Sequence, residues 1–164
     1  MIGTERLILR RPDAGDWPAY AAFMESPAAA FFAARGSRAK AWKSYGLVIW
    51  HWVHLGFGPF AVTLRGAARA VALVGPKRPE GWPEGEITWI AFPGAEGRGI
   101  AQEAARAALV HARDALGWRT AVSYIEPDNA RSVALAERLG ARRDDGAATP
   151  DPSVAAWRHD LGAA

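Results

Sequence analysis

A glycine turn between a strand-like segment and a helix-like segment is the stretch best suited to bind an anion. Residues 86–92 are mostly β-branched, apolar or aromatic, which predicts a strand. Gly97-Arg98-Gly99 follows, and from Ile100 the sequence changes to good helix formers. The first N–H groups of a helix have no partner within it and lie at the positive end of its dipole. A glycine turn before such a helix would let a phosphate group approach the backbone.

The motif excludes two familiar phosphate sites and leaves one plain alternative open. Gly-Lys followed by Ser or Thr is absent, so the turn is not a P-loop. A third glycine and a suitably placed acidic residue are also absent, which excludes the dinucleotide fingerprint. Taken alone, Gly97-Arg98-Gly99 would equally serve an ordinary tight connection between a strand and a helix.

Three motifs in order resemble the GNAT superfamily of acetyl-CoA-dependent N-acetyltransferases, and most closely its ribosomal-protein N-terminal acetyltransferase branch. The signature of that family is Gln/Arg-x-x-Gly-x-Gly/Ala, and residues 96–101 occupy it here. Glu96 stands where Gln or Arg is usual, which puts an acid near the expected pyrophosphate. Residues 4–10 resemble the opening strand of the family, and residues 126–132 and 137–141 resemble its later strand and helix.

The resemblance implies acetyl-CoA as the cofactor and assigns three groups of residues to it. The turn and the first helical residues would hold the pyrophosphate through backbone N–H groups. The central strand would bond the pantetheine amides, and the later helix would contact the cofactor arm and the sulfur. On spacing alone, the residues of that helix would equally form a helix cap. The implied residues are Gly97, Arg98, Gly99, Ile100, Ala101 and Gln102 in the turn, Trp89, Ile90 and Ala91 in the strand, and Asn129 and Ser132 in the later helix.

The resemblance also implies two catalytic roles. Glu86 occupies the region in which the family often places a carboxylate base, although a structural ion pair is an equal alternative. Ser132 matches a family position that faces the sulfur, where it would hydrogen-bond the sulfur and assist the departing thiolate. The tyrosine that often serves as the acid in the family has no counterpart in residues 133–136, so the alternative is that the thiolate leaves unassisted. Tyr124 is expected to pack.

Several other titratable residues are weaker candidates for the chemistry. Glu84 and Glu103 are further carboxylates near the expected site. His51 and His54 would be bases or substrate contacts, or else ordinary structural histidines.

The remaining pattern predicts the elements that position these residues. Apolar residues at helical spacing, including Trp42, Tyr45, Ile49 and Trp52, predict helices that pack on a core. By the resemblance, residues 28–54 border the acceptor pocket. The predicted strands are 6–10 (an edge strand), 57–64, 68–74, 86–92, 119–126 and 154–161. The predicted helices run from about 13 to 25, from 37, from 100 to 116 and from 129 to 139. Loops are expected at 75–83 and 142–152.

Composition limits the class of protein. The chain has 164 residues, half of them apolar, which predicts one soluble domain spanning residues 1–164. The absence of cysteine excludes a disulfide or a thiolate metal site, and the cytoplasm is the expected compartment. The net charge of +3 comes without a dense basic run, so no nucleic-acid partner is expected. No apolar run suits a membrane span or a signal peptide.

The sequence therefore predicts an α/β (α+β) fold: a single GNAT-like domain whose mixed central sheet has a parallel splayed pair at its centre and is flanked by helices. The predicted activity is direct acetyl transfer from acetyl-CoA to a primary amine, on a small molecule or a protein N-terminus, without a metal. The alternative is a non-catalytic acyl-CoA-binding module on the same fold. A monomer or a homodimer is expected.

Overall fold

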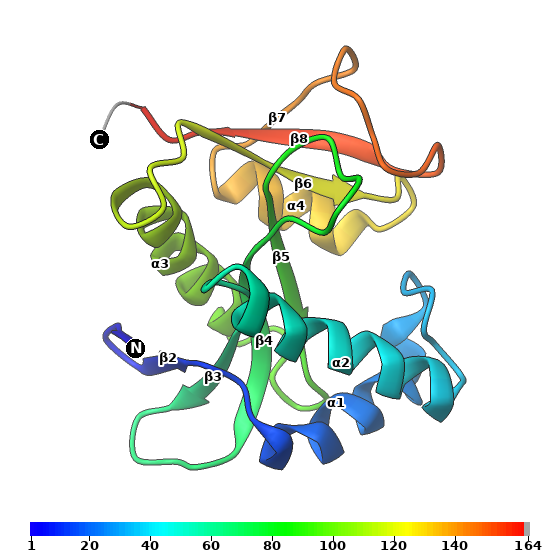
Figure 1. Cartoon of the computed structure of the whole chain (residues 1–164), viewed down its shortest axis with the longest axis vertical. Coiled ribbons are helices and arrows are strands. Elements are labelled where there is room, and N and C mark those ends of the chain that lie inside the picture. The colour runs from blue at the N-terminus through cyan, green and yellow to red at the C-terminus, as the bar shows by residue number, and fades with distance from the viewer. Residues whose placement is uncertain (163–164) are drawn as a thin grey trace.

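The computed structural model describes residues 1–162, and these form one sheet with helices on both faces (Figure 1). The strands are β1 (Ile2–Gly3), β2 (Leu7–Arg10), β3 (Phe60–Leu64), β4 (Ala70–Lys77), β5 (Glu86–Ala91), β6 (Thr120–Ile125), β7 (Arg142–Arg143) and β8 (Ala155–Asp160). The helices are the short 3-10 turns η1 (Ala14–Asp16) and η2 (Pro27–Ala29) and the α-helices α1 (Trp17–Met24), α2 (Arg38–His54), α3 (Ile100–Asp114) and α4 (Ala130–Arg138).

The sheet is mixed, as predicted, and its parallel pair lies at the centre. The strand order is β1-β2-β3-β4-β5-β6-β8-β7, and the neighbours are antiparallel except β5 and β6. β5 and β6 share the single paired position Glu86 with Val122, after which the two strands diverge (Figure 1). The crossover between them is α3, as expected for a parallel connection. The divergence leaves one edge of β5 without a neighbouring strand.

The two faces of the sheet are covered by different helices. α1 and α2 pack on one face against side chains such as Leu73 and Ile90. α3 packs on the other face against Leu7, Leu9 and Val62. Its buried residues include four alanines with no exposed surface, which lets the helix axis lie close to the sheet. α4 covers the same face beyond β5, where Ala136 packs with Ile125.

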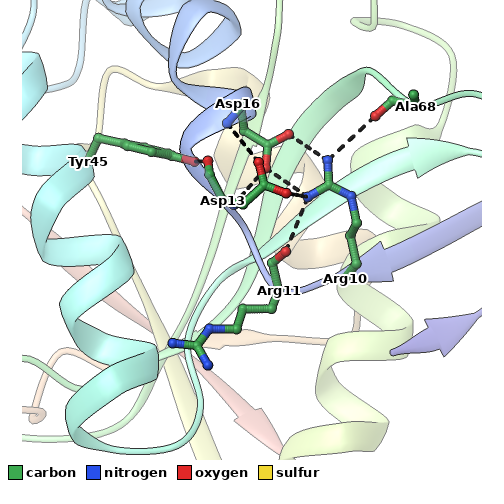
Figure 2. A network of polar contacts seen from close by, with 7 residues as sticks. Arg10, Arg11, Asp13, Asp16, Tyr45 and Ala68 are labelled. Carbon is green, nitrogen blue, oxygen red and sulfur yellow. Dashed lines mark hydrogen bonds and ion pairs between the residues drawn. The ribbon is translucent and has the colours of Figure 1, made fainter.

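An ion-pair network around the buried Asp16 fixes the start of α1 to β2 (Figure 2). Nη1 and Nη2 of Arg10 donate to the two carboxylate oxygens of Asp16 at 2.8 and 2.7 Å. The carboxylate of Asp16 also accepts from the N–H of Asp13, whose carbonyl accepts from the hydroxyl of Tyr45 on α2. Asp16 is 4% exposed, so this network orients both helices from inside the core.

β4 is longer than the sequence predicts, because it continues through residues expected to form a loop. Gly75, Pro76 and Lys77 pair with Thr88, Ile87 and Glu86 of β5. Proline lacks an N–H, yet β3 has already ended at the Phe60–Val74 pair, so Pro76 deprives no neighbouring strand of a donor.

Three further details differ from the sequence prediction. β2 is not the edge strand, because β1 pairs with it at Ile2–Leu9. β3 begins at Phe60 rather than at residue 57, and β7 forms a two-residue strand inside the predicted loop 142–152.

α2 exposes part of the stripe predicted to pack in the core. Tyr45 is buried, and Ile49 and Trp52 are partly buried against core residues. Trp42 is 62% exposed, and its ring makes an edge-to-face contact with the ring of Trp17. Trp50 is also largely exposed and stacks on His54. Within residues 1–162, no helix combines the length and apolarity required for a membrane span.

Candidate functional site

A large cavity lies where β5 meets the turn that precedes α3. It has a volume of about 1020 Å³ and is walled by the end of α1, the segment after it, β5, the glycine turn and α4. Most of the residues predicted to bind the cofactor line it, whereas Arg98 and Glu86 do not. The predicted residues that line it are Trp89, Ile90, Ala91, Gly97, Gly99, Ile100, Ala101, Gln102, Asn129 and Ser132.

The glycine turn presents a row of backbone donors at the cavity wall. Gly97 and Gly99 have φ values of 71° and 72°, a left-handed conformation that favours glycine. α3 begins at Ile100, and the first residue in its first turn whose N–H bonds a backbone carbonyl is Glu103, which donates to Gly99. Among residues 1–162, the N–H groups of residues 97–102 have no hydrogen-bond partner. This row of donors at a helix N-terminus suits a phosphate anion.

Glu96, which departs from the family signature, is turned towards its own loop. Its Oε2 accepts a hydrogen bond of 2.8 Å from the N–H of Gly94. The carboxylate therefore satisfies a backbone donor within the turn, although Glu96 also contributes to the cavity wall. The N–H row of residues 97–102 is left unpaired by this acid.

The first turn of α3 is fastened to the N-terminal segment. The carboxylate of Glu103 accepts from the Thr4 hydroxyl, from the Arg6 N–H at 2.9 Å and from Arg6 Nε at 2.7 Å. Arg6 also donates from Nη1 to the carbonyl of Arg98 at 3.1 Å. Burial opposes ionisation of Glu103, but these hydrogen bonds outweigh it and hold its pKa below the ordinary value. Glu103 is thus a structural anchor of the turn rather than a free base.

The open edge of β5 presents backbone groups to the gap between the splayed strands. The hydroxyl of Ser123 on β6 donates to the carbonyl of Ile87 at 2.7 Å, at the closed end of the gap. Backbone groups of alternate residues point to the same edge of a strand, so those of Trp89 and Ala91 face the gap as well. Ile90 pairs with Leu73 in the ladder to β4.

Ser132 and Trp89 meet across the gap. Nε1 of Trp89 donates to Oγ of Ser132 at 3.2 Å, while the N–H of Ser132 donates to Oδ1 of Asn129 at 3.2 Å. Asn129 therefore caps α4, the role that spacing alone also allowed. The bond from Trp89 occupies a lone pair of the Ser132 hydroxyl and leaves its own proton available to a group in the cavity.

Glu86 is buried beside a cation and lies outside the cavity wall. The residue is 5% exposed, and Lys77 Nζ lies 3.3 Å from its Oε2 without the alignment of a hydrogen bond. Burial raises the pKa of Glu86, and Lys77 opposes this rise. The structure therefore contains the ion pair that was the alternative to a catalytic role.

The weaker candidates are all occupied elsewhere. Glu84 bonds Arg158 through both oxygens at 2.7 and 2.8 Å, and these bonds lower its pKa. His51 accepts from the N–H of Arg78, and His54 stacks on Trp50. None of these side chains lines the cavity.

Sequence reasoning missed two features of the cavity. Arg131 and Arg138 on α4 add positive charge to the cavity wall. Phe23, Phe31 and Phe32 form an aromatic end, of which only the last two lie in the range expected to border the acceptor. The two arginines are spaced to share one face of a helix, and the phenylalanines at 31 and 32 belong to an apolar run, so both features had a signal in the sequence. Neither pattern shows which side chains line the same cavity.

The chain is similar to known acetyltransferases over nearly its whole length. The acetyltransferase (GNAT) domain matches residues 6–142. A solved acetyltransferase from Agrobacterium tumefaciens is 34% identical, with a TM-score of 0.91 over 96% of this chain and 92% of that chain.

Two solved proteins of lower identity share the fold. A ribosomal L7/L12 α-N-protein acetyltransferase in complex with coenzyme A is 16% identical, with a TM-score of 0.72 over 96% of this chain and 95% of that one. A spermidine N-acetyltransferase chimera, from Vibrio cholerae and hSSAT, is 17% identical, with a TM-score of 0.73 over 94% and 95%.

The residues present suit acetyl-CoA, the cofactor of this family. The unpaired N–H groups of residues 97–102 fit a pyrophosphate, and the open edge of β5 fits a chain of amides. Both features adjoin one cavity of sufficient size. From the matched domain, the relative at 34% identity and this site, we conclude that the chain belongs to the GNAT family and is an acetyl-CoA-dependent acyltransferase.

Proposed function

We propose that this chain transfers an acetyl group from acetyl-CoA directly to a primary amine, on a small molecule or at a protein N-terminus. The observation that carries this proposal is the row of unpartnered N–H groups at residues 97–102, which opens on the same cavity as the edge of β5. Acetyl-CoA supplies an acetyl group activated as a thioester.

The backbone performs most of the proposed binding. N–H groups of Gly97, Arg98, Gly99, Ile100, Ala101 and Gln102 donate to the pyrophosphate. Trp89 and Ala91 offer backbone groups to the pantetheine amides, and Ile90 and Asn129 add side-chain contacts. An N–H of β5 facing the gap also stabilises negative charge that develops on the carbonyl oxygen.

Two side chains are proposed to assist the transfer. Ser132 would donate a hydrogen bond from its hydroxyl to the departing sulfur and keep its proton, with its oxygen held in position by Trp89. Glu86 is the proposed proton acceptor for the amine, because a carboxylate with a raised pKa is a stronger base. Since Glu86 is outside the cavity wall, it would act through water.

Calorimetric titration with acetyl-CoA tests the binding site, using two glutamate substitutions as a matched pair. Gly99→Glu and Gly117→Glu each place the same charge at a glycine with φ near 70°, with values of 72° and 69°. Gly117 lies beyond the far end of α3, so only Gly99→Glu brings the carboxylate to the N–H row. We expect Gly99→Glu to weaken binding of acetyl-CoA by about 100-fold or more, because two negative charges brought together in a binding site cost several kcal/mol. Gly117→Glu should leave the affinity within about threefold of the parent.

The same titration tests the departure at Glu96. Because its carboxylate bonds Gly94, Glu96→Gln should bind acetyl-CoA within about threefold of the parent. A large gain in affinity would show instead that this acid obstructs the site.

Turnover distinguishes the enzyme from an acyl-CoA-binding module. The chain contains no cysteine, so thiol released from acetyl-CoA can be measured with a thiol reagent without background from the protein. The alternative is favoured by one observation, that no tyrosine is among the residues of the described range 1–162 that line the cavity. It predicts tight binding without thiol release on any amine, and a folded parent that does not bind acetyl-CoA would refute both functions.

A further inference from the structure

We propose that the acceptor is a primary amine that carries an apolar, preferably aromatic, group and no second positive charge. This inference rests on the proposed function and specifies its substrate class. It follows from a difference in chemistry between the two ends of the cavity.

The charged residues of the cavity wall all come from the glycine turn and from the region of α4. They are Glu96 in the glycine turn, and Asp128, Arg131 and Arg138 in and beside α4. These residues border the N–H row and the gap beside β5, the regions proposed to hold the cofactor. The wall contributed by α1 and the segment after it contains Phe23, Pro27, Ala28, Ala30, Phe31 and Phe32, none of which is charged.

The aromatic end is a packed surface with a defined shape. Phe23 is 3% exposed, and its ring centroid lies 5.3 Å from that of Phe32 and 6.1 Å from that of Phe92. The N–H of Phe32 donates to the carbonyl of Ala29. Phe31 is only partly buried. Such a wall offers an apolar group contact area and offers a charged group no partner.

The segment that carries this wall is also held at both ends. Ala29 donates its N–H to the carbonyl of Ser26, and Gly36 donates to the carbonyl of Met24. The guanidinium of Arg35 donates to the carbonyl of Ala30 at 2.7 Å. The backbone carbonyl of Ala30 is thereby already paired.

Three carboxylates at the end of α1, on β5 and just before α1 are paired with cations of the chain itself. Glu25 pairs with Arg38 at 3.1 Å, and Glu86 pairs with Lys77 at 3.3 Å. Asp16 is held by Arg10, away from the cavity.

The start of α2 adds further positive charge rather than a counterion. Arg38, Lys40 and Lys43 are exposed there, and the described residues of its first turn include no acid. A second ammonium on an acceptor bound against Phe23 and residues 27–32 would therefore meet apolar side chains, and none of these wall residues carries a carboxylate to accept it.

The test is a panel of amines in which the reacting α-amino group is constant. Phenylalanine amide, alanine amide and lysine amide differ only in the side chain, and spermidine adds a polyamine. We expect kcat/KM for phenylalanine amide to exceed that for alanine amide by about 30-fold or more, because each buried methylene is worth a factor of about 10 or more in such pockets. Lysine amide and spermidine should be the poorest acceptors.

Peptides beginning with phenylalanine and alanine identify the source of the amine. Discrimination retained between the two peptides points to protein N-termini as the acceptors. Discrimination retained only between the free amides points to a small molecule. Either result supports the apolar class.

Substitutions in the wall and outside it locate the discrimination. Phe31→Ala should reduce the phenylalanine-to-alanine ratio to about threefold or less while leaving acetyl-CoA affinity unchanged. Phe57→Ala is the matched control, because Phe57 packs against His51 and Trp118 outside the cavity, and it should keep the parental ratio.

The outcomes separate this inference from the proposed function. Preference for spermidine or lysine amide, or an unchanged ratio in Phe31→Ala, would overturn the apolar acceptor while leaving the acetyltransferase in place. Because the amine panel uses the parent protein, the preference it measures does not depend on whether a variant folds. Binding of acetyl-CoA without turnover of any amine would overturn the proposed function instead.

Discussion

Replacing Arg10 by Met tests whether the ion pair in Figure 2 holds α1 and α2 in place. Methionine keeps much of the apolar length of the side chain and removes the guanidinium. The carboxylate of Asp16 would then lose both bonds from Arg10 and keep one from the N–H of Asp13. A charge that was paired in the core would be left without its counterion.

The expected loss follows from the burial of the two partners. Breaking a fully buried ion pair by removing one partner costs about 3–5 kcal/mol. Asp16 is 4% exposed but the Arg10 side chain is 24% exposed, so water reaches the vacated space and reduces the cost. We expect the free energy of unfolding to fall by about 2–4 kcal/mol. For a chain of this size that lowers Tm by roughly 6–12 °C.

Denaturant unfolding measures this loss, and two further variants interpret it. Arg113→Met removes a similarly short arginine–aspartate pair, Arg113 with Asp114, on the exposed surface, and should not change Tm resolvably. The double variant with Arg10→Met and Asp16→Asn should lose about 1–2 kcal/mol less of the free energy of unfolding than the sum of the two single losses, because the asparagine amide is neutral and needs no counterion.

Function should respond through the acceptor wall that α1 carries. Arg10→Met should raise KM for the amine while the affinity for acetyl-CoA stays within about threefold, since the N–H row lies in the glycine turn and the first turn of α3. A loss of stability no larger than that of Arg113→Met, or a recovery of zero in the double variant, would refute the reasoning.

Two further predictions concern groups near the splayed strands. Burial lowers the pKa of His159 from 6.5 to about 4, so between these pH values the unfolded chain binds more protons than the folded chain. The contribution of the neutral His159 to the free energy of unfolding is therefore fully present above pH 6.5 and is lost as the pH falls towards 4. The loss is about 3 kcal/mol at about 1.36 kcal/mol per pH unit, and denaturant unfolding of His159→Gln should show a pH dependence weaker than that of the parent by this amount. Ser132→Ala removes the proposed hydrogen-bond donor to the sulfur, and steady-state kinetics should show kcat lower by about 10-fold or more with unchanged affinity for acetyl-CoA; an unchanged kcat would mean that the thiolate leaves without assistance.

Local patterns in the sequence predicted the elements and the cofactor turn. Gly97 and Gly99 both adopt the left-handed backbone conformation, which glycine adopts more readily than any other residue, so the residue type alone indicated a tight turn. The strand at 86–92 and the helix from residue 100 were predictable from composition, because each is long enough for its pattern to be clear.

Contacts between distant residues could not be predicted in this way. Glu86 was equally compatible with a base and an ion pair until β4 was seen to extend to Lys77 beside it. Glu96 was expected near the pyrophosphate, and only its bond to Gly94 shows that the acid faces its own turn. The aromatic end of the cavity required Phe23 and Phe32 to meet, and no period in the sequence relates them.

The bonds between the N-terminal segment and α3 link two events thermodynamically: the docking of that segment on α3 and the binding of a ligand at the glycine turn. The N–H of Arg6 and the carboxylate of Glu103 are 97 residues apart in the chain, so this closure occurs only when most of the chain has found its place. A ligand at residues 97–102 would favour the closed arrangement, and the docked segment would in turn favour the ligand by the same factor. Amide hydrogen exchange in β2 would therefore report occupancy of a site to which β2 contributes no wall.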